Sequence, residues 1–349
     1  MKVLVTGGLG FIGSHICLEL LSNNFEVLVV DSLINSNSLV IDNINKIVSQ
    51  NKLNVRKMRI YEADLRDECK LIDIFREHSI KESSIGAVIH CAGLKSVNDS
   101  VGSPIDYWAN NVGGTIKLIK VMEEFGCNTI IFSSSATIYG VGDGGLINEN
   151  ATINPINPYG QTKAAVERFL KDVFYSGNQK WKIVNLRYFN PTGAHKSGLI
   201  GESPKGLANN IFPIISKVAL KKKDKLKIFG NNWDTKDGTG VRDYIHVMDL
   251  AEGHILALKY LNNVKEEFLN INLGNGIGTS VLELIKTYQE SNNVEIPFEF
   301  VGRRKGDFGH VVADNSKAIS LLKWKPKRSI KDMCKDSWRW NLLYPNGYV

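Results

Sequence analysis

Two short stretches of the sequence carry side chains whose types and spacing could do chemistry on an alcohol. Tyr159 and Lys163 are four residues apart, a spacing that places both on one face of a helix. A nearby ammonium favours the phenolate and lowers the pKa of a tyrosine toward neutrality, so Tyr159 could act as a general base. The second stretch, Ser133–Ser135, follows an apolar strand pattern. Each stretch alone also suits an amphipathic helix or a serine-rich turn, so the elements around them must be identified.

A glycine-rich stretch near the start of the chain predicts a nucleotide site. Thr6–Gly13 reads Thr-Gly-Gly-Leu-Gly-Phe-Ile-Gly and lies between a strand pattern and a helix pattern. Glycines let the backbone approach a pyrophosphate, and the helix N-terminus offers free N–H groups. Asp31 ends the next predicted strand, where a carboxylate can accept hydrogen bonds from an adenosine ribose, although a simple turn residue also suits this position. A carboxylate there would repel a 2′-phosphate, so the expected coenzyme is NAD rather than NADP.

Short β-branched runs alternate with helical patterns in the first half of the chain. The helical spacing is clear at Ile12, Ile16 and Leu20. Such alternation predicts a parallel sheet covered by helices on both faces, and right-handed crossovers make the sheet doubly wound. The expected fold class is therefore α/β, a Rossmann-type doubly wound parallel sheet with a second, smaller α/β domain. The predicted strands are Lys2–Thr6, Glu26–Asp31, Arg56–Glu62, Ala87–Cys91, Thr129–Ser133 and Lys182–Tyr188.

A change in composition near residue 190 predicts where the first domain ends. Gly, Asn and Pro become frequent, as in Asn190–Pro191 and Asn209–Asn210, and the regular alternation stops. We therefore assign residues 1–189 to a coenzyme-binding Rossmann domain and residues 190–349 to a substrate domain. Residues from about 238 to 255 are expected to return to the first domain.

The composition excludes several classes of protein. Of the 349 residues, 43% are hydrophobic and 23% are charged, values typical of a globular chain and not of a disordered or fibrous one. No run of 18 apolar residues could cross a membrane, and Val3–Val5 is too short for the apolar core of a signal peptide, so no leader is expected. The net charge of +7 is modest, and the basic run Lys221–Lys225 is better explained as a solvated helix end than as a nucleic-acid site.

The cysteines predict neither a disulfide framework nor a metal site. There are five, widely spaced and without a C-x-x-C pair. Such a pattern fits a reducing compartment, and we expect the protein to be cytoplasmic. Cys91, in the apolar run Ala87–Cys91, is most simply a small buried hydrophobe.

Blocks of sequence in both halves of the chain resemble the extended short-chain dehydrogenase/reductase family, and within it the epimerases that act on UDP-sugars. The resemblance covers nearly the whole chain. It is specific, because Arg187–Pro191 and Gly240–Val247 would match few families, whereas the glycine-rich loop would match many. It implies that residues 190–349 bind a UDP-sugar and that the protein is a homodimer. The matching blocks are Val3–Ser14, Ala92–Lys95, Asn110–Val112, Phe132–Gly140, Pro158–Lys163, Leu186–Ala194, Gly238–Leu250, Arg303–Asp307 and Trp338–Tyr348.

The resemblance implies a role for each matched residue. Tyr159 would remove the proton from the 4-hydroxyl of the sugar, Ser135 would hydrogen-bond the same hydroxyl, and Lys163 would hold the nicotinamide ribose and lower the pKa of Tyr159. The NAD contacts would be Gly7, Gly10, Phe11, Ile12 and Gly13 around the pyrophosphate, Asp31 at the adenosine ribose, Asp64 and Leu65 at the adenine, and Lys95 and Asn110 at the centre. The substrate contacts would be Asn190, Asn210, Arg242 and Arg304 at the UDP moiety, with Asp307 and Val311 beside the sugar.

The implied reaction interconverts UDP-galactose and UDP-glucose. The 4-hydroxyl loses its proton while its carbon gives a hydride to tightly bound NAD, the 4-keto sugar turns over about its phosphate linkage, and the hydride returns to the opposite face. In the resembled family, the position four residues after the aspartate matched by Asp307 acts as a gate. Valine at this position, Val311, is expected to admit 2-acetamido sugars such as UDP-N-acetylglucosamine and UDP-N-acetylgalactosamine.

Three alternatives stay open. Another NAD-dependent nucleotide-sugar epimerase or a 4,6-dehydratase would share the fold, but the dehydratase needs an Asp-Glu pair where this chain has Ala136 and Thr137. A dehydrogenase acting on a hydrophobic alcohol would have no use for Asn190, Arg242 and Arg304. The non-enzyme alternative is a redox-sensing or scaffold protein, because a fold alone does not determine function. Such proteins usually lose the tyrosine or the lysine.

Overall fold

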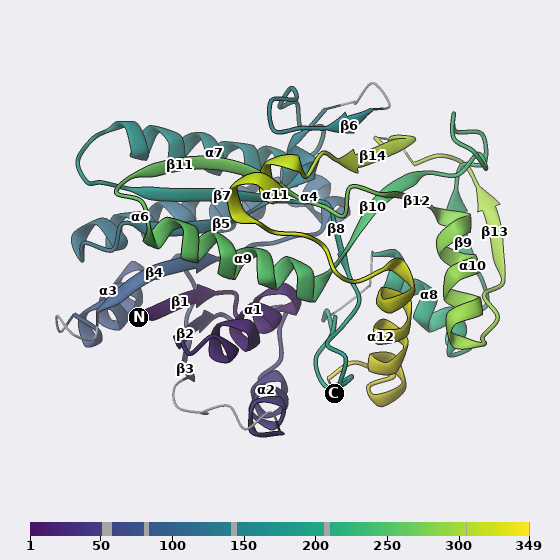
Figure 1. Ribbon diagram of the computed structural model, residues 1–349, viewed down its shortest axis with the longest axis horizontal. Helices are drawn as coiled ribbons and strands as arrows, with labels where there is room; N and C mark the ends of the chain where they lie inside the picture. The colour runs from purple at the N-terminus through teal and green to yellow at the C-terminus, as the bar shows by residue number, and fades with distance from the viewer. Residues whose placement is uncertain (51–57, 80–83, 141–144, 206–209, 305, 349) are drawn as a thin grey trace.

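Seven strands of the described chain form one parallel sheet (Figure 1). The structure is a computed structural model that describes residues 1–50, 58–79, 84–140, 145–205, 210–304 and 306–348. The strands follow the spatial order β11-β7-β5-β4-β1-β2-β3. Their bounds are Lys2–Thr6 (β1), Glu26–Asp31 (β2), Met58–Glu62 (β3), Ile85–His90 (β4), Thr129–Ser135 (β5), Lys182–Tyr188 (β7) and Glu267–Leu273 (β11).

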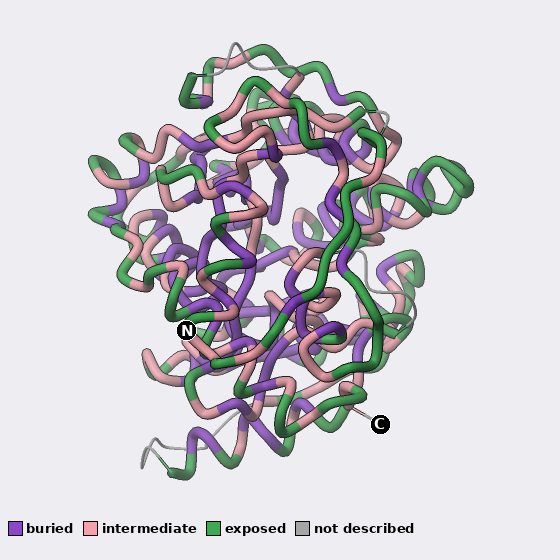
Figure 2. The backbone as a smooth tube through the Cα atoms, turned by 90° about the vertical axis from the view of Figure 1, so that its right-hand side faces the viewer, coloured by how far each residue is buried: buried purple, intermediate pink, exposed green. Residues whose placement is uncertain are grey.

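Both faces of this sheet are buried because neighbouring residues of each central strand point into different apolar layers. On β1, Val3 and Val5 belong to one core cluster, and Leu4 belongs to the other. Helices α1 and α9 cover the first layer, and α3, α6 and α7 cover the second. Buried residues accordingly gather in the interior of the molecule, and exposed residues lie along its outer turns (Figure 2). A sheet covered in this way leaves its strand ends as the places where polar groups can gather.

The helices connect the strands as the crossover pattern requires. They are Phe11–Ser22 (α1), Leu39–Gln50 (α2), Glu68–Glu77 (α3), Val97–Gly102 (α4), Pro104–Tyr107 (α5), Gly114–Glu124 (α6), Pro158–Tyr175 (α7), Ile211–Ala219 (α8), Val247–Asn262 (α9), Val281–Asn292 (α10), Ser316–Leu322 (α11) and Ile330–Leu343 (α12). A π-helical turn, η1, covers Trp108–Gly113, and a 3-10 turn, η2, covers Ala136–Ile138.

A second, smaller sheet is built around a strand from the later half of the chain. β10 pairs in parallel with β14 and β8 and antiparallel with β12, and β14 pairs with β6. Helices α8, α10 and α12 share one apolar cluster next to this region. The bounds are Leu146–Ile147 (β6), Asn190–Thr192 (β8), Val241–His246 (β10), Gly278–Ser280 (β12) and His310–Ala313 (β14), and a separate parallel pair joins Leu226–Phe229 (β9) to Phe298–Val301 (β13).

The predicted fold class is confirmed, and the strand bounds differ only at their ends. The predicted strand Ala87–Cys91 begins earlier, at Ile85, and ends at His90. The strand predicted to end at Ser133 continues to the third serine. Of the predicted strand Arg56–Glu62, residues 56 and 57 lie outside the described residues and the rest is β3. The strands found as predicted are Lys2–Thr6, Glu26–Asp31 and Lys182–Tyr188.

The later half of the chain also contributes to the first sheet. β11 pairs with β7 along its whole length, and α9 packs against α1. Within the segment 238–255, residues 241–246 form β10 of the second sheet, and residues 247–255 begin α9. The division of the chain at residues 189 and 190 stays a prediction.

A buried ion pair fastens α7 to the sheet beside the strand ends. Arg187 on β7 and Glu167 on α7 are 1% and 5% exposed. Two hydrogen bonds join them, from Nε to Oε1 at 3.0 Å and from Nη2 to Oε2 at 2.7 Å. The guanidinium also donates to the hydroxyl of Tyr139 and to the carbonyl of Glu149, and Ser134 donates to Glu167. Removal of either charged partner would leave the other buried without compensation.

We therefore predict that Arg187→Met lowers the free energy of unfolding by about 3–5 kcal/mol, because Glu167 stays buried as an unpaired carboxylate. The matched control is Arg168→Met on the same helix as Glu167, since Arg168 forms an exposed pair with Asp172. The control should change the free energy of unfolding by less than about 0.5 kcal/mol. Urea denaturation of both variants measures the difference. Equal midpoints for the two variants would show that the buried pair does not hold α7.

Candidate active site

The glycine-rich stretch forms the turn between β1 and α1. Gly7 has a φ of +66°, and a Cβ at this residue would lie 2.8 Å from the backbone of Ala92, so only glycine suits both the conformation and the space. Gly13 packs so closely on the turn that a Cβ would lie 2.2 Å from the carbonyl oxygen of Gly7. Gly10 is the N-cap of α1, and no side chain of the described residues caps this helix. The N–H groups of its first turn are therefore available to an anion.

Asp31 lies at the carboxyl end of β2, and its carboxylate organises the loop that follows. Its Oδ1 accepts hydrogen bonds from the backbone N–H of Leu33 at 3.0 Å and from the hydroxyl of Ser36 at 2.7 Å. Its Oδ2 accepts from the N–H of Leu9 at 2.9 Å. Asp31 thus joins the glycine-rich turn to the loop after β2, and it lines the cavity in which the sequence predicts an adenosine ribose.

The predicted catalytic side chains come from a strand end and the first turns of a helix. Ser135 is the last residue of β5, and Tyr159 and Lys163 lie one turn apart on α7. Asn157 caps this helix by accepting a hydrogen bond from a backbone N–H of the first turn, at 2.8 Å. Pro158 occupies the first helical position, where its missing N–H costs nothing. The cap therefore sets where Tyr159 enters the helix and where Lys163 follows.

Lys163 is buried against the sheet. Its Nζ donates to the carbonyl oxygen of Ser133 at 2.8 Å and lies 4.7 Å from the centre of the Phe132 ring. Burial lowers the pKa of the Lys163 ammonium to about 8. The ammonium is bonded to a neutral oxygen, so its charge is not cancelled by its hydrogen-bond partner.

The role predicted for Lys163, to lower the pKa of Tyr159, stays a prediction. Burial raises the pKa of the Tyr159 phenol to about 12, and a hydrogen bond with Ser135 opposes that rise only in part. The Lys163 Nζ lies 5.9 Å from the centre of the Tyr159 ring and donates its hydrogen bond to the carbonyl oxygen of Ser133.

All the residues predicted to contact NAD line one cavity of about 420 Å³. The cavity lies at the carboxyl ends of the strands. The winding of the sheet changes direction there, between the neighbouring strands β1 and β4. The predicted catalytic residues and two predicted substrate residues share its wall. The predicted residues that line it are Gly7, Gly10, Phe11, Ile12, Gly13, Asp31, Asp64, Leu65, Lys95, Asn110, Ser135, Tyr159, Lys163, Asn190 and Asn210.

Four predicted substrate residues lie outside that wall, in a group on β10, β14 and the loop before β14. Arg304 donates from Nε to the carboxylate of Asp307 at 3.0 Å, and Val311 pairs with Arg242 between β14 and β10. Among the described residues, the guanidinium of Arg242 makes one hydrogen bond, to the carbonyl oxygen of the preceding residue. Tyr244, two residues further along β10, does line the cavity. One strand therefore connects the arginine group to the cavity.

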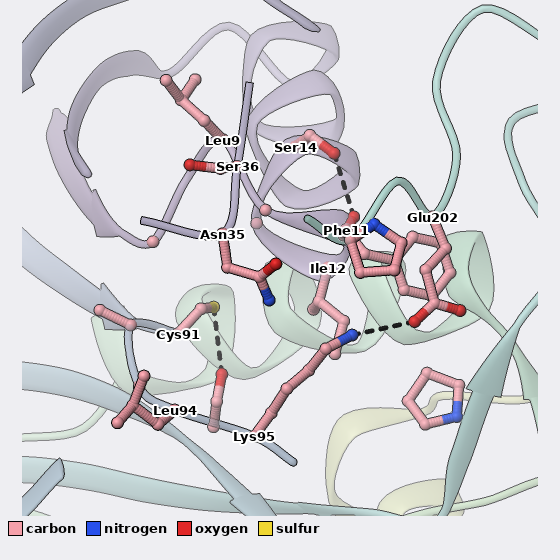
Figure 3. Close-up of a pocket in the computed structure, with 18 of the residues that line it drawn as sticks. Leu9, Phe11, Ile12, Ser14, Asn35, Ser36, Cys91, Leu94, Lys95 and Glu202 are labelled. Carbon is pink, nitrogen blue, oxygen red and sulfur yellow. Dashed lines mark hydrogen bonds and ion pairs between the residues drawn. The ribbon is translucent and has the colours of Figure 1, made fainter. Parts of the chain in front are cut away.

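Glu202 is a cavity residue that sequence reasoning missed. Its Oε1 accepts hydrogen bonds from Lys95 Nζ at 2.9 Å and from Asn210 Nδ2 at 2.8 Å, and the ion pair with Lys95 crosses the cavity in Figure 3. The carboxylate of Glu202 thus binds both Lys95, a predicted coenzyme contact, and Asn210, a predicted substrate contact. Glu202 and Lys95 are 107 positions apart, so no local pattern could have found this pair.

Other missed residues border the loop after β2. Asn35 and Ser36 line the cavity (Figure 3), and Ser36 donates a hydrogen bond to Asp31. The polar run that follows Asp31 was an available signal, since such folds place ligand contacts just after their strands. Tyr348 and Ser203 line the same cavity from the other half of the chain and carried no such signal.

The described residues contain neither a cluster of metal-ligating side chains nor a membrane-spanning helix. Within those residues, no group of three or more His, Cys, Asp or Glu side chains could hold a metal ion. The five cysteines are free thiols. No described helix is both long enough and apolar enough to cross a bilayer.

Comparisons with known proteins identify the family. The family model described as GDP-mannose 4,6 dehydratase matches residues 4–337. A UDP-glucose 4-epimerase of Bacillus subtilis is 46% identical over 349 residues, which cover 100% of this chain and 99% of that protein. Two solved structures are 42% identical to this chain. A UDP-glucose 4-epimerase of Stenotrophomonas maltophila, with bound NAD and formylated UDP-arabinopyranose, has a TM-score of 0.93 and covers 99% of each chain.

The second solved structure is a UDP-glucose 4-epimerase of Bifidobacterium longum in complex with NAD+ and UDP, with a TM-score of 0.92 and 100% of each chain covered. These similarities extend over both sheets, as the resemblance in the sequence implied. The chain therefore belongs to the UDP-glucose 4-epimerase family of extended short-chain dehydrogenases/reductases.

Proposed function

We propose that the protein is a UDP-glucose 4-epimerase that interconverts UDP-galactose and UDP-glucose with tightly bound NAD. The observation that carries this proposal is the cavity at the carboxyl edge of the first sheet. Its wall holds Ser135, Tyr159 and Lys163 together with the glycine-rich turn and Asp31. A hydroxyl-activating group and a dinucleotide site therefore share one enclosed space, as a hydride transfer from an alcohol requires.

The residues of the cavity fit NAD. Gly10 leaves the N-terminus of α1 without a side-chain cap, which suits the pyrophosphate, and Asp31 places a carboxylate where the adenosine ribose is expected. That carboxylate would face a 2′-phosphate with like charge, so NAD is favoured over NADP. When bound, NAD supplies the hydride acceptor and a positively charged ring that favours the Tyr159 phenolate.

The chain's own residues would then move one proton and hold one hydroxyl. Tyr159 takes the proton of the sugar 4-hydroxyl, and Ser135, hydrogen-bonded to the same phenol, keeps that hydroxyl in line. Lys163, now held by Ser133, would contribute its ammonium to the nicotinamide ribose and to the phenolate. The product of the first half-reaction is a 4-keto sugar.

The second half-reaction requires the keto sugar to turn over while its nucleotide stays bound. Arg242 and Arg304 suit this task, because a guanidinium donates several N–H groups to phosphate oxygens. Asn190 and Asn210 line the cavity together with the catalytic residues, and we assign them to the UDP moiety. A firm hold on the UDP and a loose hold on the sugar permit return of the hydride to either face.

A 4,6-dehydratase is disfavoured even though a dehydratase family model matches the chain. Its elimination step needs an acid–base pair after the third serine, and this chain has η2, which begins with Ala136 and Thr137. The Thr137 hydroxyl donates to Ser135 Oγ at 2.9 Å and adds no carboxylate. The site therefore supports oxidation and reduction at one carbon without loss of water.

We further propose that two copies of the chain associate. Large apolar side chains are exposed along α4, α5, η1 and α6, among them Val101 at 66%, Ile105 at 82% and Trp108 at 44%. An exposed apolar strip of this kind marks an interaction surface, and the family resemblance suggests a homodimer. Sedimentation of the protein distinguishes one copy from two.

The five free thiols suit a reducing cytoplasmic compartment.

Val311 supports a wider sugar specificity. It is partly buried on β14 and packs against a cluster that contains Phe189, which lines the cavity. Family members with tyrosine at the matched position are confined to plain hexoses, and valine is much smaller than tyrosine. We therefore propose that the pocket also accepts UDP-N-acetylglucosamine and UDP-N-acetylgalactosamine.

The assignment of Tyr159 as the base can be tested by mutation. Tyr159→Phe should lower the rate of UDP-galactose conversion by at least roughly 10²-fold, because the phenolic oxygen is the proton acceptor. The variant should fold normally and keep its NAD, since the ring and the cavity wall are unchanged. The rate is measured by coupled oxidation of the UDP-glucose formed.

The matched control is Tyr175→Phe on the same helix, where the tyrosine is 69% exposed and far from the catalytic turn. This variant should turn over like the wild type. A Tyr159→Phe protein that kept more than roughly a tenth of the wild-type rate would be incompatible with the assigned base.

The proposed sugar specificity can be tested at Val311. The wild type should convert UDP-N-acetylgalactosamine, and Val311→Tyr should lose that activity roughly ten- to hundredfold while it keeps UDP-galactose conversion. The reason is a clash of the larger ring with the N-acetyl group, which costs about 1–3 kcal/mol in a close-packed wall. The ratio of kcat/KM for the two substrates measures the effect. Either a wild type inert toward the acetamido sugar or an unchanged ratio in the variant would rule out the gate.

A further inference from the structure

The loop that follows β2 is hydrogen-bonded directly to two segments from the other half of the chain. Asn37 Nδ2 donates to the carbonyl oxygen of Tyr348 at 3.1 Å, across 311 positions of sequence. Lys205 donates twice, from its backbone N–H to Asn35 Oδ1 at 2.8 Å and from Nζ to the carbonyl oxygen of Leu33 at 2.7 Å. We call these contacts the clasp, formed by Leu33–Asn37 on one side and Ser203–Lys205 with Tyr348 on the other.

Both sides of the clasp line the cavity that holds the predicted coenzyme contacts. Asn35 and Asn37 stand in its wall from the first side, and Ser203 and Tyr348 from the second. The wall next to them contains Asp31, the residue assigned to the adenosine ribose. The clasp therefore joins two parts of the wall of the cavity that also holds Asp31.

Tyr348 is fixed firmly on its own side. Its backbone N–H donates to Ser203 Oγ at 2.9 Å, and its hydroxyl donates to the carbonyl oxygen of Leu199 at 2.9 Å. Its ring packs against those of Trp340 and Tyr344, with centres 4.8 and 5.2 Å away. Burial raises the pKa of the Tyr348 phenol, so the hydroxyl stays a neutral donor.

A second row of hydrogen bonds lies behind the clasp. Asn43 on α2 is 3% exposed, and its Nδ2 donates to the carbonyl oxygen of Leu199 and to the hydroxyl of Tyr344, both at 3.0 Å. In Figure 1, the C-terminal end of the chain accordingly lies between α2 and α12. The C-terminal segment that carries Tyr344 and Tyr348 is thus hydrogen-bonded both to the loop after β2 and to α2, the helix that follows this loop.

The loop side of the clasp depends on the same carboxylate that is assigned to the coenzyme. Asp31 accepts hydrogen bonds from Leu33 and Ser36, and the carbonyl oxygen of Leu33 accepts from Lys205. Leu33 has a φ of +56°, a conformation that a leucine adopts only when its surroundings hold it there. The position of this loop therefore depends on its bonds at both ends.

We propose that the clasp retains the coenzyme. NAD could leave the adenosine end of the cavity only after Leu33–Asn37 separates from Ser203–Lys205 and Tyr348, so the later half of the chain supplies residues that hold a ligand of the first sheet. This proposal rests on the proposed use of NAD. It explains how coenzyme can stay bound through many turnovers while the sugar exchanges elsewhere in the cavity.

The test measures how fast bound NAD exchanges. Holoprotein is mixed with excess radiolabelled NAD, and the label that stays with the protein is followed by rapid gel filtration. Asn37→Asp removes the N–H donor to Tyr348 and places a carboxylate next to the carbonyl oxygen of Tyr348. The substitution keeps the side-chain oxygen that accepts a hydrogen bond from the N–H of Leu39 at the start of α2. This variant should exchange NAD at least roughly tenfold faster than the wild type.

The matched control is Ser38→Asp, which adds the same charge at the next position, an exposed residue outside the cavity wall. It should exchange NAD at the wild-type rate. Tyr348→Ala cuts the clasp from the other side and should also exchange faster, whereas Tyr348→Phe keeps the ring and both backbone bonds and should resemble the wild type.

Each outcome decides the proposal. Fast exchange in Asn37→Asp with slow exchange in Ser38→Asp supports the clasp, and equal exchange in these two variants overturns it. The exchange rate of Tyr348→Ala is compared only if that variant folds. The exchange rate of Asn37→Asp decides the proposal in either case. A wild type that binds no NAD at all would overturn the proposed function and the clasp together, so the two failures are distinguishable.

Discussion

The strands of the first sheet all run parallel and are buried on both faces, and this constraint determines where the chemistry of the protein can lie. The strands are largely apolar, so the polar side chains that a ligand could reach gather at and beyond the strand ends. Because the strands are in register, β1, β2, β4, β5 and β7 all end at one edge. The glycine-rich turn, Asp31, Lys95 and Ser135 follow those ends and meet in one cavity. The site is therefore a consequence of the sheet's direction.

The buried charges near this edge divide into two kinds by their partners. Arg187 is matched to Glu167 by two hydrogen bonds, and the pair holds a helix to the sheet. Lys163, one turn before Glu167 on α7, is bonded to a carbonyl oxygen, and burial lowers its pKa to about 8. A charge buried without a matching charge costs free energy unless a ligand uses it. This difference separates the ion pair that stabilises the fold from the ammonium that serves the reaction.

The parts of the fold and site that depend on local pattern could be predicted from the sequence. The strand Lys2–Thr6, the glycine turn and the Tyr159–Lys163 spacing are local, and the structure contains each of them. Glu202 and Tyr348 could not be predicted, because their contacts join segments that lie far apart in the chain. The raised pKa of Tyr159 also could not be predicted, since it depends on burial in the folded chain.

The central claim is that one cavity binds the coenzyme permanently and uses it as an internal hydride carrier. The most direct test is to assay the purified protein with UDP-galactose and no added nucleotide. The account predicts many turnovers to UDP-glucose per chain, and NAD, not NADP, as the nucleotide released on denaturation. Two results would contradict this account. One is conversion that starts only after NAD is added and that consumes NAD in proportion to the product formed; the other is no conversion at all.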